Sequence, residues 1–371
     1  MGRNVALIHD FFVQDGGAER CAIELARLLP TATVHTSFFD ERTFGDRIAP
    51  ERVRPWPLQR VFGPTRRFRS FLPLYPLWFS ILDFRPADLV VSSSVAFAKA
   101  VRTSPRAVHI SYIYTPLRYA WDLDRYLAGS SYGVVARIGA RTAQPLLRRW
   151  DRMTAHRPDV LVAISDEVRR RIRRLWRRDA RVIYPPVETS EITLSASDDG
   201  FLLVAARLLA YRRIDLAVEA CRILGRELVV VGDGPERDRL EALATGSKVR
   251  FLGHIGRSAL LDVFARCHAY LLPGVEDFGI APLEAAAAGK PVAAYRAGGA
   301  LETVVEGVSG VFFDRPDARS LAEAIERLDA TAFAPEELRR HAQRFDTAVF
   351  VDSWRRLFAE LGVDPQLFSP A

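Results

Sequence analysis

Short apolar runs alternate with helical patterns along almost the whole chain. The first half has runs at 5–8, 88–91, 108–111 and 159–164, and the second half has runs at 201–206, 228–231, 249–252, 269–273, 291–295 and 310–313. Each run is short enough for a buried strand, and the stretches between many of them repeat their apolar residues with the helical period. Strands that alternate with helices are typical of parallel sheets covered on both faces. The pattern therefore predicts an α/β fold with two doubly wound, Rossmann-like domains.

The boundary between the two halves lies in a polar stretch. Residues 188–200 carry few apolar side chains, which is typical of a connection between domains. We expect an N-terminal domain at 1–187, a linker at 188–199 and a C-terminal domain at 200–346. Amphipathic helices are predicted near 335–344 and 348–361, and the final segment, 347–371, is expected to return and pack on the first domain.

The chain is basic, and its cysteines are few. A net charge of +7 over 371 residues favours an anionic partner, which could be nucleic acid, an acidic membrane surface or a phosphorylated substrate. Three widely spaced cysteines give neither a disulfide framework nor a zinc motif, so we expect a reducing, cytoplasmic setting. The N-terminal residues become polar too early for a signal peptide, and no apolar run reaches transmembrane length. Any membrane contact is then expected to be peripheral, at the inner face.

Two segments rich in arginine allow two interpretations each. Residues 52–79 mix aromatic side chains with arginines, and residues 166–178 form a helix with one apolar stripe and many arginines. Both could be ordinary helices with solvated arginines. Both could also dock on an anionic membrane.

The segment 276–284 holds the most specific candidate chemistry. An apolar strand precedes it, Gly279 supplies a turn, and Pro282 suits the first turn of a helix. Backbone N–H groups at such a helix start attract phosphate, whereas the carboxylates of Glu276 and Glu284 would accept hydrogen bonds from hydroxyl groups. A sugar nucleotide, with a diphosphate between two hydroxyl-rich rings, fits this arrangement. The alternative is a surface loop that happens to carry two acids.

Glycine-rich turns after two other predicted strands are compatible with the same kind of ligand, and the alternative is a plain connection from strand to helix. Gly16 and Gly17 follow the first strand, and Gly232 follows the strand at 228–231, so the backbone can approach a ligand closely at both places. The spacing G-x-G-x-x-G is absent, and a dinucleotide cofactor is therefore not favoured.

Four pieces of the chain together resemble the family-four retaining glycosyltransferases, which have the GT-B fold. They are His9-Asp10 with the glycine turn at 16–19, the stretch 205–215, the stretch 230–236, and the 276–284 segment continuing to 297–302. The aromatic segment at 52–79 and residues 114–122 resemble those of bacterial mannosyltransferases that build O-antigen and exopolysaccharide from GDP-mannose. The resemblance implies two domains that face each other across a cleft, a sugar-nucleotide donor, a lipid-linked or membrane-facing glycan acceptor, and neither a metal ion nor a further cofactor.

The resemblance also implies roles for individual residues. Glu276, Arg207 and Arg212 would be catalytic, with the arginines at the donor diphosphate and Glu276 at hydroxyls of the transferred sugar. Glu284 would hold the ribose, and further donor contacts would come from Gly16, Gly17, Gly232, Phe278, Gly279 and Ile280. The acceptor side would be formed by His9, Asp10, Tyr114 and Arg118.

Two positions depart from the family pattern. Arg212 stands where the family usually has Lys, which replaces a compact ammonium with a planar fork of donors. Tyr114 stands where related sequences often have His; a phenol can bond a sugar hydroxyl but is not a cation near neutral pH. The sequence leaves open a GT-B sugar-nucleotide epimerase or hydrolase, which needs no acceptor, and a sugar-nucleotide-binding protein with little or no turnover. A nucleic-acid binder is not favoured, because no DNA or RNA recognition module is present.

Overall fold

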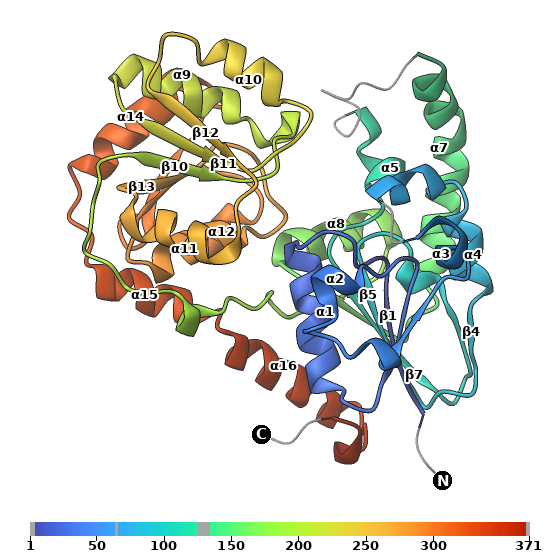
Figure 1. The fold of residues 1–371 in the computed structure, drawn as a ribbon. Coiled ribbons are helices and arrows are strands. Elements are labelled where there is room, and N and C mark those ends of the chain that lie inside the picture. Colours follow the sequence, from blue (N-terminus) through green and yellow to red (C-terminus); the bar gives the residue numbers. More distant parts are fainter. Residues whose placement is uncertain (1–3, 64–65, 125–133, 369–371) are drawn as a thin grey trace. The chain divides into compact units, whose positions relative to one another are not determined.

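The chain folds into two compact units. The computed structural model describes residues 4–63, 66–124 and 134–368, and within these ranges all side chains except those at 66, 67, 69 and 134–136. The first unit comprises Met1–Leu123, Ile138–Pro186 and Ala348–Ala371, and the second comprises Asp124–Arg137 and Val187–Thr347. Residues 64–65 of the predicted aromatic segment lie outside the described residues (Figure 1).

A parallel sheet of seven strands, in the order β3-β2-β1-β5-β7-β8-β9, is the centre of the first unit. Its strands, in chain order, are β1 (Val5–His9), β2 (Thr33–Thr36), β3 (Val53–Pro55), β5 (Leu89–Ser94), β7 (Val108–Ile113), β8 (Val160–Ala163) and β9 (Arg181–Val182). A separate parallel pair joins β4 (Asp83–Phe84) to β6 (Arg102–Thr103). The helices are α1 (Gly17–Leu28), α2 (Glu41–Phe44), α3 (Gln59–Phe62), α4 (Tyr75–Ile81), α5 (Arg118–Trp121), α7 (Val134–Thr154), α8 (Asp166–Trp176) and α16 (Thr347–Glu360).

Helices cover both faces of this sheet. On one face, Ala6 and Ile8 of β1 share a core with α4 and with Trp150 of α7. On the other face, the ring of Tyr112 in β7 lies 5.6 Å from that of Trp354 in α16. The C-terminal helix therefore packs on the first unit, although the chain between 187 and 347 belongs to the second.

The edge strand β3 and its neighbour β2 were not among the predicted runs. Strands β2 and β3 are four and three residues long, and only alternate positions of β2 are buried. Such strands lack the continuous apolar run of a central strand, and pairing with the neighbouring strand defines them instead.

The second unit is built on a parallel sheet of six strands, in the order β12-β11-β10-β13-β14-β15. The strands are β10 (Leu202–Ala205), β11 (Leu228–Val231), β12 (Val249–Gly253), β13 (Ala269–Leu272), β14 (Val292–Tyr295) and β15 (Gly310–Phe313). The helices are α9 (Ile214–Leu224), α10 (Arg237–Leu243), α11 (Arg257–Arg266), α12 (Ile280–Ala287), α13 (Ala300–Thr303), α14 (Ala318–Asp329) and α15 (Pro335–Gln343).

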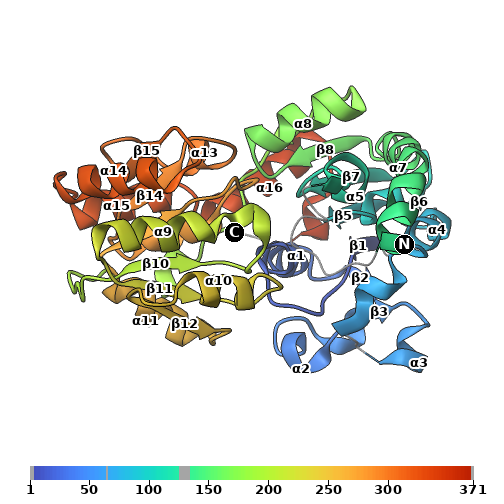
Figure 2. The same ribbon diagram turned by 90° about the horizontal axis from the view of Figure 1, so that it is seen from above.

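Two groups of helices enclose the second sheet. Helices α9, α10 and α14 form one group, and α11, α12 and α15 form the other (Figure 1; Figure 2 gives the view from above). The apolar side chains of β10, β11 and β13 are buried between these groups. Both sheets are parallel and doubly wound, which confirms the predicted fold class.

The polar stretch at 188–199 is packed on the second unit. Ser195 donates its N–H to the carbonyl of Ala288, and the guanidinium of Arg339 binds the carbonyls of Thr189 and Ile192. The division between the units falls after Pro186, and the predicted linker residues belong to the second unit.

Most aromatic side chains of the 52–79 segment belong to the core of the first unit. Trp56, Phe68, Tyr75 and Phe79 are buried, whereas Phe62 is 54% exposed. Among the described residues, no helix combines the length and the apolarity needed to cross a membrane.

Candidate functional site

The predicted donor-side residues of the second unit lie on loops that follow β10, β13 and β14. Parallel strands end at one edge of the sheet, so these loops meet there. At Gly274 the loop after β13 approaches the backbone at 211–212 so closely that a side chain would lie 2.6 Å from a carbonyl oxygen. At Gly298, with a φ of +64°, a Cβ would lie 2.4 Å from the carbonyl oxygen of Glu276. Glycine at both positions lets the three loops pack backbone to backbone.

This packing brings Arg212 and Glu276 together. Their side chains form an ion pair, and they retain 22% and 18% exposure respectively. The Nε atom of Arg212 is buried without a hydrogen-bond partner in the described structure. A small cavity of about 10 Å³ lies beside the pair and is also lined by Ala206, Tyr270 and Gly274. The two residues predicted to act on the donor are therefore neighbours, in a partly solvated position at the carboxyl edge of the sheet.

Glu284 is held by an arginine that the sequence did not single out. It lies in the second turn of α12, is 5% exposed, and forms an ion pair with Arg257 at the start of α11. The same guanidinium lies 4.0 Å from the carboxylate of Glu188. No motif contains Arg257, and only the fold brings α11 and α12 side by side.

The remaining donor-side predictions occupy different environments. Arg207 is exposed, two residues after β10. Gly232 has a φ of +120° and its backbone lies against the carbonyl of Ala206. Phe278 is buried and packs its ring 5.7 Å from that of Phe345, so it contributes to the core beneath the loop. Gly279, with a φ of +98°, is the N-cap of α12, and Ile280 is its first residue.

Asp10 organises the carboxyl edge of the sheet in the first unit. It is fully buried, and its carboxylate accepts four backbone N–H groups, from residues 95–98, at 2.6–2.9 Å. Burial raises the pKa of Asp10, and these N–H groups oppose that shift by stabilising the charged form. The role that the structure assigns to Asp10 is to fix the loop after β5.

His9 and Tyr114 belong to one buried network with Ser93. The hydroxyl of Ser93 lies 3.0 Å from Nδ1 of His9 and 2.9 Å from the hydroxyl of Tyr114. Tyr114 also donates to the carbonyl of Ala18, in the first turn of α1. Burial lowers the pKa of His9 to about 4, so this imidazole is neutral near pH 7. Tyr114 thereby fastens the first turn of α1 to the sheet, whereas His9 joins the end of β1 to Ser93 in β5.

Glu19 is a buried acid of this turn to which the sequence assigned no role. Gly16 is the N-cap of α1 and Gly17 its first residue. A Cβ at Gly16 would lie 2.7 Å from the carboxylate of Glu19, which is only 3% exposed. Burial raises the pKa of Glu19 to about 8, with a contribution from the nearby Asp15. The spacing of three residues between the N-cap and an acid is the signal that could have identified it, since this is the spacing of a capping box.

Arg118, the fourth residue predicted on the acceptor side, begins α5 and is partly buried. It lies four residues after Tyr114, in the segment that leads to Trp121. The predicted site residues thus form two groups, one within each unit.

Two family models match the chain in succession. Residues 15–191 match the model described as Glycosyltransferase Family 4, and residues 188–344 match the one described as Glycosyl transferases group 1. The change from one model to the next lies near the division between the two units after Pro186.

Curated relatives match parts of the chain. A glycogen synthase of Mycobacterium tuberculosis (strain CDC 1551 / Oshkosh) is 37% identical over 126 residues, which cover 32% of this chain and 30% of the relative. A GDP-mannose-dependent alpha-(1-6)-phosphatidylinositol dimannoside mannosyltransferase of Mycobacterium tuberculosis (strain ATCC 25177 / H37Ra) is 34% identical over 175 residues, 45% of this chain and 44% of the relative. The matches therefore span about half of these relatives or less.

Solved structures match nearly the whole chain at low identity. The crystal structure of Anabaena Alr3699/HepE in complex with UDP has a TM-score of 0.70 and 18% identity, and the match covers 96% of this chain and all of that one. The lipopolysaccharide outer core galactosyltransferase WaaB has a TM-score of 0.65 and 15% identity, with 96% and 99% covered. These likenesses confirm the predicted GT-B fold. The chain is therefore a two-domain protein of GT-B fold, whose first part matches the Glycosyltransferase Family 4 model and whose second part matches the glycosyl transferases group 1 model.

Proposed function

We propose that this protein is a retaining glycosyltransferase that moves a hexose from a sugar nucleotide to a lipid-linked or membrane-facing glycan. The observation that carries the proposal is the ion pair of Arg212 with Glu276 on adjoining loops at the carboxyl edge of the second sheet. A cation for phosphate and an acceptor for sugar hydroxyls are thereby placed side by side. The matches of both domains to glycosyltransferase models support the same conclusion.

Each charged group has a role in this reaction. The departing nucleoside diphosphate gains negative charge, and fixed guanidinium groups of Arg212 and Arg207 stabilise it together with the N–H groups at the start of α12. Glu276 binds hydroxyls of the transferred sugar. Glu284, which is buried and fixed by Arg257, binds the ribose.

The acceptor attacks from the face that the diphosphate leaves, and the leaving phosphate takes the acceptor's proton. This scheme needs no strong protein base and assigns no step to a metal ion. In this proposal Gly16 and Gly17 bind the donor diphosphate through their backbone, and His9, Asp10, Tyr114 and Arg118 shape the acceptor side. The buried positions of His9, Asp10 and Tyr114 favour a supporting role, in which they hold the loops that meet the acceptor.

GDP-mannose is the donor that we propose. The resemblance of residues 114–122 to bacterial mannosyltransferases supports it, as does the similarity to a relative described as GDP-mannose-dependent. UDP-sugars are the principal competitors, since a structural neighbour is described in complex with UDP.

A panel of sugar nucleotides in a thermal-shift assay tests the donor. The true donor binds only the folded protein and raises its melting temperature well beyond the other sugar nucleotides. Release of nucleoside diphosphate with and without a lipid-linked glycan then separates a transferase from a hydrolase or an epimerase, which need no acceptor.

Variants test the assigned roles. Glu276→Ala and Arg207→Ala are expected to abolish transfer, whereas Arg250→Ala, which removes an exposed arginine paired with Glu227 on the same unit, retains it. Undiminished turnover in both active-site variants would refute these roles.

A further inference from the structure

The outer face of α7 gathers positive charge without acidic partners. Arg148, Arg149 and Arg152 line a shallow hollow of about 530 Å³, together with Pro145 and Met153. Within the part of the chain that the structure describes, none of the three guanidinium groups pairs with a carboxylate. The hollow therefore presents three uncompensated cations to solvent.

Two of these arginines are fixed in place. Arg148 donates Nε–H to the carbonyl of Ala120 at 2.8 Å, and Arg152 donates Nε–H to that of Leu175 at 3.1 Å. Both guanidinium carbons also lie over the ring of Trp121, at 5.4 and 4.8 Å from its centroid. Because these contacts use Nε, the terminal nitrogens of both guanidinium groups remain for an anion such as phosphate.

Apolar side chains are exposed along the same helix. Ile138 is 58% exposed, Leu146 71% and Met153 57%. Intervals of eight and seven residues place them on one side, since each interval is close to two helical turns. Exposed hydrocarbon beside uncompensated guanidinium groups is the composition of a helix that lies in a lipid interface.

Helix α8 provides a contrast, because it is even richer in arginine than α7. Its Arg170 and Arg171 both pair with Glu167, and Arg173 pairs with Asp179. Its apolar stripe is buried in the first unit. Helix α8 thus lacks the exposed hydrocarbon of α7, and four of its five arginines are paired, so the structure favours solvated arginines over membrane docking for this helix.

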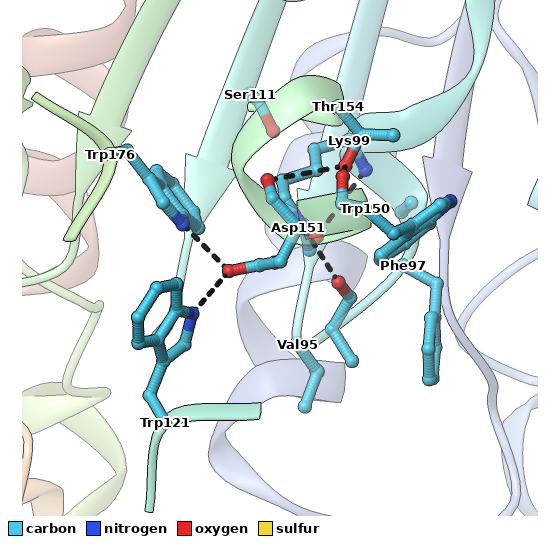
Figure 3. A network of polar contacts seen from close by, with 12 residues as sticks. Val95, Phe97, Lys99, Ser111, Trp121, Trp150, Asp151, Thr154 and Trp176 are labelled. Atoms are coloured by element: carbon cyan, nitrogen blue, oxygen red, sulfur yellow. Dashed lines mark hydrogen bonds and ion pairs between the residues drawn. The ribbon is translucent and has the colours of Figure 1, made fainter. Parts of the chain in front are cut away.

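The inner face of α7 is anchored to the loops on the acceptor side (Figure 3). Asp151 accepts Lys99 Nζ at 2.7 Å, and its other oxygen accepts the indole N–H groups of Trp121 and Trp176, each at 2.7 Å. Trp121 is the last residue of α5, in the segment that contains Tyr114 and Arg118. Whatever binds the outer face of α7 is therefore connected, through Asp151 and Trp121, to that segment.

We propose that the outer face of α7 docks on an anionic phospholipid surface and holds the acceptor-side loops there. The arginines bind lipid phosphates, and Ile138, Leu146 and Met153 enter the boundary between headgroups and acyl chains. A nucleic acid or a soluble phosphate would satisfy the cations but would leave the three apolar side chains in water. The delivery of a lipid-linked acceptor rests on the proposed function, whereas docking itself does not.

Co-sedimentation of the full chain with vesicles tests the proposal. Binding is expected to vesicles that contain phosphatidylglycerol, and little binding to phosphatidylcholine alone. Arg149→Gln is expected to lower the partition coefficient about fivefold, the contribution of one basic residue near an anionic surface. Leu146→Ser is expected to lower it about tenfold through the loss of buried hydrocarbon. Arg106→Gln, an exposed arginine on the turn before β7, is the matched control and should bind as the parent protein does.

Both variants change exposed side chains, and an unchanged melting temperature shows that they fold. Equal partition of Arg149→Gln, Leu146→Ser and Arg106→Gln would overturn the proposal, as would equal binding to both kinds of vesicle. Displacement from vesicles by inorganic phosphate alone, with no effect of Leu146→Ser, would also overturn it in favour of a soluble anion. Vesicle binding is measured without a sugar nucleotide, so its failure is distinguishable from failure of the proposed transfer reaction.

Discussion

The buried ion pair between Lys99 and Asp151 gives a quantitative test of how the first unit is held together. The two side chains are 1% and 0% exposed and lie 2.7 Å apart. Asp151 keeps two indole donors when Lys99 is lost, whereas Lys99 without Asp151 keeps only the carbonyl of Ala96 and the faces of two tryptophan rings. Removal of either partner leaves a buried charge, so Lys99→Met or Asp151→Asn should each cost about 3–5 kcal/mol of unfolding free energy.

The double variant distinguishes pairing from separate contributions. With both charges removed, no isolated ion remains, and the cost should fall short of the sum of the single costs by about 2 kcal/mol. The two indole N–H groups then share a neutral amide instead of a carboxylate, which keeps part of the cost in place.

Tryptophan fluorescence in urea reports this unit selectively. All six tryptophans belong to the first unit, at positions 56, 78, 121, 150, 176 and 354. Their transition therefore measures the unfolding of that unit, while circular dichroism follows both units. Strict additivity of the two single costs in the double variant would refute the reasoning, because it would mean that the charges do not depend on each other.

Three further predictions concern the two domains separately. The pKa of Glu19 is about 8 in the folded state and near 4.5 in the unfolded state, so between these values the folded protein keeps a proton that the unfolded chain releases. Stability should therefore fall as pH rises from about 4.5 to about 8. Glu19→Gln should remove that fall in melting curves followed by tryptophan fluorescence. Gly232→Ala should lower the unfolding free energy by about 3 kcal/mol, measured in urea by circular dichroism, because its Cβ would lie 2.1 Å from a carbonyl oxygen. Gly246 also has a positive φ but has open space around it, so Gly246→Ala should lower it by only about 1 kcal/mol. Equal losses would contradict the steric argument. Arg257→Ala removes the guanidinium that holds Glu284 and should raise KM for the donor about tenfold with little change in kcat. Arg257→Lys should recover part of the lost donor affinity. A loss confined to kcat would contradict a role in ground-state binding.

The sequence predicted the parts of the fold that local pattern determines. Central strands such as β1, β11 and β13 are almost continuous apolar runs, and they were placed almost to the residue. Strands β2 and β3 were missed because their stability comes from the neighbouring strand. The ring contacts of Tyr112 with α16 join residues more than 200 positions apart, and no local pattern encodes them.

The same distinction applies to the candidate sites. Arg212 and Glu276 could be expected to meet, since both follow strands whose carboxyl ends share an edge. Arg257 could not be expected, because its partner Glu284 is 27 positions away on another helix and no motif links the two. Tyr114 was expected to offer its hydroxyl to a sugar. In the structure that hydroxyl instead lies 2.9 Å from the hydroxyl of Ser93 and donates to the carbonyl of Ala18 in α1.

Helices α7 and α8 show why arginine content alone does not identify a docking surface. In α8 Glu167 lies three and four residues from Arg170 and Arg171 and pairs with both, Asp179 just after the helix pairs with Arg173, and Val168, Ile172 and Trp176 are buried. In α7 the described acid is Asp151, and Lys99 and two indoles draw it into the core. With that carboxylate turned inward, the arginines on the outer side have no intrahelical counterion. The buried network and the exposed positive surface therefore both result from the orientation of Asp151. Because its carboxylate is buried against Lys99 and the two indoles, the opposite side of α7 is the basic one.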